Sequence, residues 1–320
     1  MLNGTRRFGA LALAVVVFAG ACSAAATTVP TDTPAATPTA TPMAAASSAA
    51  PAMTPAAAAT ISCVTGSITA SGSTALQPLV DAAAKKYDAA CPGATITVNG
   101  GGSGTGLTQV SSGGVQIGDS DVTAESKLAA ADAAKLVDHI VAKQGWIVVT
   151  NPDVTGVTNL TTQQNIDIWT GKDTNWNQVG GPDLPIVLIF RPASSGTRST
   201  FKKLVLGGKT EASGGQTLTE DSNGAVTTAI TKTNGAVSVI GFAYYNDPAN
   251  KSKLNGLQLD GVDATVANMT GGTYKLSADG HMYSNGQPDG LTAAFLAYML
   301  GKDVQGTLIP SMFYAPVAAQ

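Results

Sequence analysis

The chain has 320 residues, of which 12% are charged and 44% are hydrophobic, and 18 basic and 21 acidic residues give it a formal net charge of −3. This length is enough for one large domain or two modest ones. The acidic balance excludes the basic field that nucleic-acid-binding proteins normally present, so no nucleic-acid partner is expected.

The first 21 residues are expected to be a secretory signal peptide. Arg6 and Arg7 precede an apolar stretch over 8–19, which is too short to span a membrane as a stable helix. Small residues then lead to Cys22. This arrangement resembles a bacterial lipoprotein signal, in which the cysteine is lipidated and becomes the new N-terminus. Ordinary signal cleavage, with Cys22 discarded or free, is the alternative.

Residues 22–62 are rich in alanine, threonine and proline, and Asp32 is their only charged residue. Such a segment cannot bury enough apolar surface to offset the entropy lost on ordering. We therefore expect a flexible linker between a lipid anchor and a folded body that covers 63–320. The anchor would hold this body on the outer face of the cytoplasmic membrane.

With Cys22 assigned to the lipid, Cys63 and Cys91 remain as a pair in an exported protein. A disulfide between them would close a loop of 28 residues and contribute about 3–4 kcal/mol in the chain-entropy model. Two buried free thiols are the alternative. His139 and His281 are isolated and no Cys–His spacing typical of a metal site occurs, so neither a metal nor a cofactor is expected.

The body begins as alternating short strands and helices, with a turn rich in small residues after each strand. The expected strands cover 67–70, 94–98 and 115–118, and the expected helices include Leu76–Tyr87 and a short one around Leu107 and Val110. This is an α/β pattern, in which ligands bind at the carboxyl ends of the strands.

The same alternation continues along the second half of the chain. Strands are expected over 146–150, 186–190 and 236–245, and helices over 161–169, 199–206, 224–230 and 291–300. The glycine-rich stretch 271–290 is expected to form a surface hairpin and loop. The repeated α/β units favour two lobes over one sheet.

Three turns, Gly72–Thr74, Gly102–Gly106 and Arg191–Arg198, each join a strand to a helix. A helix N-terminus offers unpaired N–H groups and a partial positive charge, so three such ends could together hold a small oxyanion. For a single turn the structural alternative is stronger: a tight connection with Ser103 as the N-cap. No P-loop lysine is present.

Arg191 ends an apolar strand, and a guanidinium can bind a tetrahedral oxyanion through two parallel hydrogen bonds. Arg198 lies at the following helix start, and one of the two arginines is expected to be structural; we assign the ligand to Arg191. Asp121 would repel a bound anion unless that anion carries a proton to donate, as monohydrogen phosphate does and sulfate does not. Asp119 is expected only to cap the next turn.

Together these motifs resemble one family. Gly72-Ser73-Thr74-Ala75-Leu76, the Gly100–Gly106 run, Ile117–Asp121 and Arg191–Thr197 occur in the order found in the phosphate-binding component of bacterial phosphate ABC transporters. The resemblance implies a two-lobed α/β type II periplasmic-binding-protein fold with crossover hinge strands. The first lobe would cover about 64–142 plus 246–320, and the second about 143–245.

The resemblance also implies a set of residues that surround one dehydrated phosphate between the lobes. These are Thr74, the N–H of Ala75, Ser103, Asp121, Arg191, Ser195, Gly196 and Thr197. The chain departs from the family in two places. Within this set, Ala75 replaces a common aromatic residue, and beside it Ala193 replaces an aspartate that steers the arginine.

The resemblance implies a monomeric protein that binds inorganic phosphate, catalyses no reaction and delivers its ligand to a membrane permease powered by an ATPase. Three alternatives stay open at this point. One is a receptor for another oxyanion, such as sulfate or molybdate. The second is a secreted serine hydrolase or phosphatase that uses Ser195. The third is an anchored phosphate sensor or adhesin without a transport role.

Overall fold

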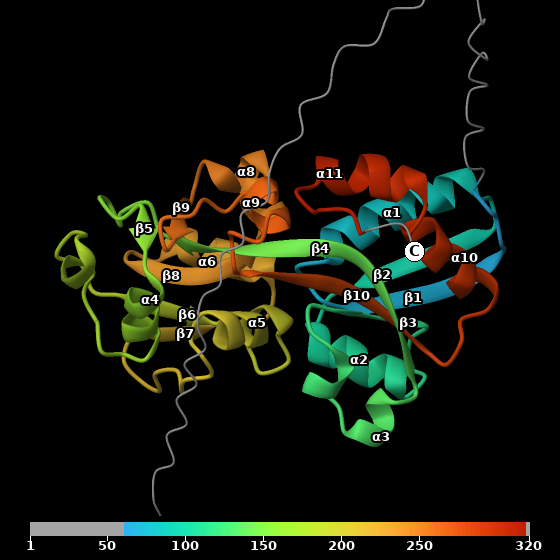
Figure 1. Ribbon diagram of the computed structural model, residues 1–320, viewed down its shortest axis with the longest axis horizontal. Helices are drawn as coiled ribbons and strands as arrows, with labels where there is room; N and C mark the ends of the chain where they lie inside the picture. The colour runs from blue at the N-terminus through green and yellow to red at the C-terminus, as the bar shows by residue number, and fades with distance from the viewer. Residues whose placement is uncertain (1–60, 318–320) are drawn as a thin grey trace, which may run out of the picture. The chain divides into compact units, whose positions relative to one another are not determined.

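The computed structural model describes residues 61–317, so the expected signal peptide, Cys22 and nearly all of the linker lie outside the described residues. Eight strands follow one another in the order β2-β1-β3-β10-β4-β8-β6-β7, and β9 joins β4 and β5 beside this series (Figure 1). The strand bounds are Gly66–Gly72 (β1), Ala94–Asn99 (β2), Ile117–Ser120 (β3), Leu136–Thr150 (β4), Asn159–Leu160 (β5), Val187–Phe190 (β6), Thr217–Thr219 (β7), Ala236–Gly241 (β8), Asn255–Leu259 (β9) and Ser277–Asn285 (β10).

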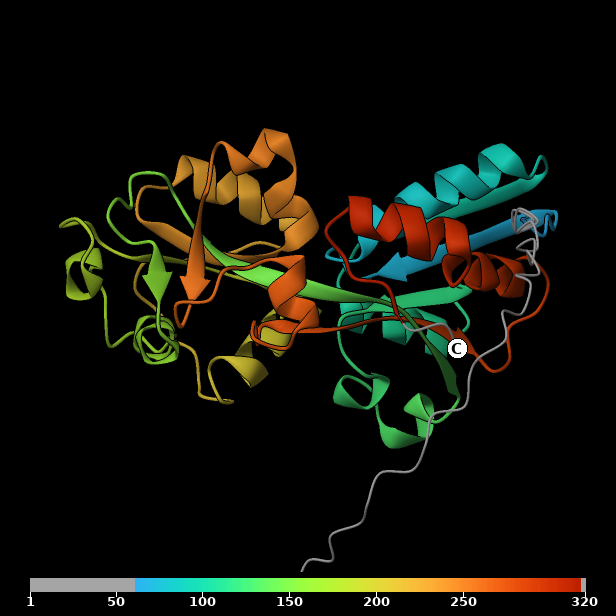
Figure 2. The ribbon, with the colours of Figure 1, turned by 45° about the horizontal axis from the view of Figure 1, so that its top comes forward.

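The first lobe is built on β1, β2 and β3, which pair in parallel. One face of these strands carries a core that includes Leu79, Tyr87 and Phe295, and α2 packs on the other face through Leu107 and Val110 (Figure 2). The helices of this lobe are Gln77–Ala90 (α1), Ser103–Ser111 (α2), Ala124–Ser126 (η1), Ala130–Ala133 (α3), Gly290–Met299 (α10), Val304–Leu308 (η3) and Ile309–Ser311 (α11).

The second lobe has its own core, in which every residue of β6 and β8 is buried. Trp146, Trp169 and Trp176 pack in this core, with Leu257 of β9. The helices of this lobe are Thr162–Trp169 (α4), Trp176–Val179 (η2), Gly196–Leu204 (α5), Asn223–Lys232 (α6), Phe242–Asn246 (α7), Pro248–Lys251 (α8) and Val266–Thr270 (α9).

Two long strands run between the lobes. β4 pairs antiparallel with β10 along its first part and with β8 along its last part, while β10 also pairs with β3 of the first lobe (Figure 1). This confirms the predicted two-lobed α/β fold with crossover strands. Within residues 61–317, β4 pairs in both halves of the sheet and β10 runs beside it, so these strands are the natural place for a hinge.

Three expectations about the second half of the chain were wrong. Residues 271–290 contain the central strand β10, which is buried because it has a pairing partner on each side. The expected strand 236–245 ends at Gly241, where α7 begins. Residues 254–276 pack in the second core through Leu257 and Met269, so the chain returns to the first lobe near Ser277 and not at 246.

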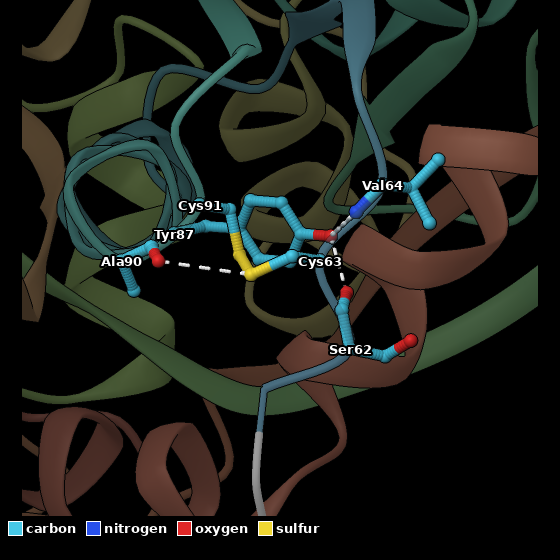
Figure 3. The surroundings of a disulfide bond; sticks show 6 residues. All are labelled: Ser62, Cys63, Val64, Tyr87, Ala90 and Cys91. Atoms are coloured by element: carbon cyan, nitrogen blue, oxygen red, sulfur yellow. Dashed lines mark hydrogen bonds between the residues drawn. A yellow bond between two sulfur atoms is a disulfide. The ribbon is translucent and has the colours of Figure 1, made fainter.

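Cys63 and Cys91 form a disulfide with a Cα–Cα separation of 5.1 Å (Figure 3). It ties the segment before β1 to the end of α1, and the Tyr87 hydroxyl beside it donates to the Ser62 carbonyl at 2.6 Å. The amino ends of parallel strands meet here, at the far end from their ligand-binding edge. Among residues 61–317, none of the helices is both long and apolar enough to cross a bilayer.

Candidate functional site

Four segments that begin helices meet where the two lobes touch. They are the turn Ser73–Ala75 before α1, Ser103 at the start of α2, Ser195 as the N-cap of α5, and Asn223 at the start of α6. Each follows a strand or a loop at the carboxyl edge of the sheet, which the α/β pattern predicts. The site is therefore lined by small hydroxyl groups, amides and helix N-termini, not by a cluster of basic side chains.

Asp121 follows β3 and is only 2% exposed. Its carboxylate accepts hydrogen bonds from the Ser73 hydroxyl, from Gln144 Nε2 at 3.0 Å and from Thr197 Oγ1 at 3.3 Å. Its own N–H donates to Ser103 Oγ at 2.9 Å. The carboxylate is thus bonded from both lobes, because Ser73 belongs to the first and Thr197 to the second.

Burial is the main influence on the ionisation of Asp121, and it raises the pKa of this carboxyl. The hydrogen bond from Ser73, the positive charge of Arg191 and the hydrogen bonds from Gln144 and Thr197 oppose the rise. A carboxylate held in such a place is a strong hydrogen-bond acceptor, because it has lost its water.

Arg191 is 4% exposed and is oriented by backbone carbonyls. Its Nε donates to Glu220 at 3.0 Å, and its Nη2 donates to Asp221 at 2.9 Å. The guanidinium is thus held by backbone carbonyls, although Ala193 stands where the resemblance placed an aspartate. The Nη1 group is buried and has no hydrogen-bond partner among the described residues. Burial lowers the pKa of Arg191, and the charge of Asp121 partly opposes this.

Thr74 and Asn223 connect Arg191 to both lobes. The Thr74 hydroxyl oxygen accepts from Arg191 Nη2 at 3.2 Å and from Asn223 Nδ2 at 2.9 Å, and it still has its own O–H to donate. Asn223 is fully buried, and its carbonyl oxygen accepts from the Gly241 amide at 2.9 Å. Sequence reasoning missed Asn223, although Ser222-Asn223-Gly224 had the same small polar pattern as the other helix starts.

The lobes are in close contact at Gly196. A Cβ added there would lie 2.1 Å from Ser103 Oγ and 2.6 Å from Asp121 Cβ, so only glycine fits at this contact. The Gly104 amide also donates to the Ser194 carbonyl across the interface at 2.8 Å. Thr197 is fixed from its own lobe by Trp146 Nε1 at 3.1 Å. These contacts describe lobes that are closed on one another.

Of the sequence-predicted residues, Thr74, Ser103, Asp121, Arg191, Ser195, Gly196 and Thr197 are all buried at this junction. Ala75 is buried too, but its N–H donates to Ser73 Oγ at 3.1 Å and so already has a partner. Ser103 is the first residue of α2 and not its N-cap, which is Gly102. Arg198 has the structural role, because it pairs with Glu211 at 2.7 Å.

The expected capping role of Asp119 was wrong. Both of its carboxyl oxygens are buried and have no hydrogen-bond partner in the described part of the chain. Burial, and secondly the charge of Asp121, raise the pKa of Asp119 well above its usual range. Its side chain is enclosed because β3 lies between β1 and β10.

The histidines do not support a Ser195 nucleophile. Within residues 61–317, His139 contacts the Ser284 hydroxyl and His281 pairs with Asp138 at 2.9 Å, while Ser195 Oγ accepts from the Arg198 amide at 3.2 Å. A serine nucleophile needs a base that it can reach by a hydrogen bond. The same residues contain no group of three or more histidines, cysteines or carboxylates able to hold a metal ion.

Comparison with known proteins agrees with this geometry. The family model described as a PBP superfamily domain matches residues 57–303. The phosphate-binding protein PstS of Bacillus subtilis is 45% identical over 253 residues, which are 79% of this chain and 81% of that protein. A Clostridium perfringens protein solved with bound phosphate superposes with a TM-score of 0.71 at 28% identity, covering 79% of this chain and all of the other. An ABC-type phosphate transport receptor of Vibrio cholerae gives 0.61 at 31% identity over the same shares.

Proposed function

Because the chain belongs to the PBP superfamily and, within it, to the family of the PstS phosphate-binding proteins, we propose that it binds inorganic phosphate between its two lobes. The buried Nη1 group of Arg191 is the observation that carries this proposal. It is a charged donor without a partner in the described part of the protein, and such a group is costly unless a ligand satisfies it. A bound anion would supply both the charge and the acceptor.

The surrounding groups fit a tetrahedral oxyanion that keeps one proton. Arg191, the hydroxyls of Thr74 and Ser103, and the N-terminus of α5 at Gly196 and Thr197 would donate to its oxygens. The Ser195 hydroxyl accepts from Arg198 and still has a hydrogen to donate. Asp121 would accept the proton that monohydrogen phosphate carries.

This acceptor would also exclude sulfate. Fully ionised sulfate has no proton to offer, so its oxygen would face a desolvated carboxylate and the two charges would repel. The same argument applies to molybdate and makes phosphate the preferred oxyanion. The absence of a base beside Ser195, among the described residues, argues against the hydrolase alternative.

Delivery to a transporter follows from the same family relationship. We propose that phosphate closes the lobes about β4 and β10, and that the closed form is recognised by a membrane permease coupled to an ATPase. The protein itself would act as a monomer and catalyse no reaction. Lipidation of Cys22 would keep it beside the permease on the outer face of the cytoplasmic membrane, with 22–62 as the tether.

Calorimetric titration of the body 63–320 with phosphate and with sulfate tests the proposal. We expect saturable binding of phosphate with one site per chain and at least about 100-fold weaker binding of sulfate, because one buried unpaired charge costs several kcal/mol. Arsenate, which has the same shape and carries a proton, should compete. Equal affinity for sulfate and phosphate, or no phosphate binding, would refute the proposed function.

A further inference from the structure

Lys127 joins the two lobes at a place that the sequence motifs do not include. It follows η1 in the first lobe, and its side chain is half-buried. Its ammonium donates to the Ala193 carbonyl at 2.7 Å and to the Ser199 hydroxyl at 2.6 Å. A third acceptor, the Ser195 carbonyl, lies at 3.5 Å. All three acceptors belong to the second lobe.

These acceptors lie on both sides of the residues proposed to contact phosphate. Ala193 precedes Ser195 and Gly196, and Ser199 follows them by one helical turn. An ammonium bonded to both ends would hold the start of α5 at a fixed position relative to the first lobe. An ammonium has three donors, so it can make these contacts together. The charge adds strength to each bond.

We propose that Lys127 is a positioning residue for ligand binding, a latch whose hydrogen bonds form when the lobes close and hold the α5 N-terminus over the bound anion. The inference rests on the proposed function and adds a residue that contacts other residues of the protein and not the ligand. The latch acts after the ligand has docked, because its two halves come from different lobes. It therefore slows ligand release more than it speeds capture.

The charges around Lys127 limit how the latch works. Desolvation lowers the pKa of its ammonium, the positive charge of Arg198 lowers it further, and Asp121 opposes both. Closure thus removes water from the ammonium, and the acceptors of the second lobe replace that water. A side chain of similar shape without N–H donors could not make these hydrogen bonds. The closed form of such a variant would therefore be less stable.

Lys127→Met tests the latch, because methionine keeps the apolar stem and removes the donors. Stopped-flow phosphate release from this variant should be about tenfold faster than from the wild type, with an equal association rate and an unchanged melting temperature without ligand. Lys127→Arg should restore most of the slow release. Lys135→Met is the matched control, because Lys135 pairs with the nearby Asp132 at 2.8 Å, and this variant should release phosphate at the wild-type rate.

A second measurement needs no substitution. Amine acetylation followed by mass spectrometry should show Lys127 protected when phosphate is added, while Lys135 stays reactive. Phosphate binding by the wild type without protection of Lys127, or with equal release rates for Lys127→Met and wild type, would overturn the latch alone. A wild type that binds no phosphate would overturn the proposed function, and the latch with it.

Discussion

At the scale of single residues, the site combines one buried arginine with two buried acids that differ in their hydrogen bonding. Arg191 is fixed by carbonyls, and its Nη1 has no hydrogen-bond partner among residues 61–317. Asp121 is satisfied by donors from both lobes, whereas Asp119, two residues earlier, has none among the described residues. Burial of the Asp119 carboxyl therefore destabilises the folded state, and no hydrogen bond to a described residue offsets this cost.

This cost predicts a pH-dependent gain from Asp119→Asn. A carboxyl whose pKa is raised on folding holds its proton more tightly in the folded state, so stability falls as pH rises from about 4 through the raised pKa. Asparagine does not ionise and escapes this loss. Calorimetric melting of the phosphate-free protein should show the variant's advantage over wild type grow by at least about 2 °C between pH 5 and pH 8. A difference that stays constant with pH would mean that Asp119 carries no such penalty.

At the scale of elements, the contact between the start of α5 and the first lobe depends on the missing side chain of Gly196. Position 196 is the first residue of α5, and any Cβ there meets Ser103 and Asp121. Gly224 stands near the start of α6 and has only Tyr244 Cε1, at 4.0 Å, near its Cβ direction. Both glycines follow a small polar residue at a helix start. Gly196 faces the first lobe in close contact, whereas Gly224 has room for an added Cβ.

Gly196→Ala should therefore weaken phosphate binding by at least about tenfold, because the lobes cannot close to the same distance. Gly224→Ala should bind phosphate as the wild type does and gain up to about 1 kcal/mol of stability, as alanine does in helices. Calorimetric titration of both variants measures their phosphate affinity, and thermal melting measures their stability. Tight binding by Gly196→Ala would show that closure at this contact is not needed.

The helices and strands also differ in how well the sequence alone predicts them. Apolar strands such as β6 and β8 and the turns at Thr74, Ser103 and Arg191 were predictable from local pattern alone. Strand β10 was not, because its sequence Ser277–Asn285 is polar and contains glycine, and its burial comes from β3 and β4, which are distant in sequence. Gln144 and Lys127 join the site for the same reason: only the folded chain brings them there.

At the scale of the whole molecule, two cores that each fold around their own strands are joined by β4 and β10. Several hydrogen bonds between polar groups cross between the lobes near the site: Asp121 with Thr197, Thr74 with Arg191, and Lys127 with Ser199. Polar contacts lose little when water replaces them. Such an interface can open and close, and an anion held by both sides would shift it toward the closed form.

In the proposed site Asp121 selects a protonated anion, and Asp121→Asn tests this selection most directly. An amide can donate to an oxyanion and carries no charge, so the penalty on sulfate should disappear. In calorimetric titrations at neutral pH, the ratio of the sulfate Kd to the phosphate Kd should fall at least about tenfold in the variant, with phosphate binding retained. A variant that binds phosphate and shows the same ratio as the wild type would mean that Asp121 does not select the protonated anion.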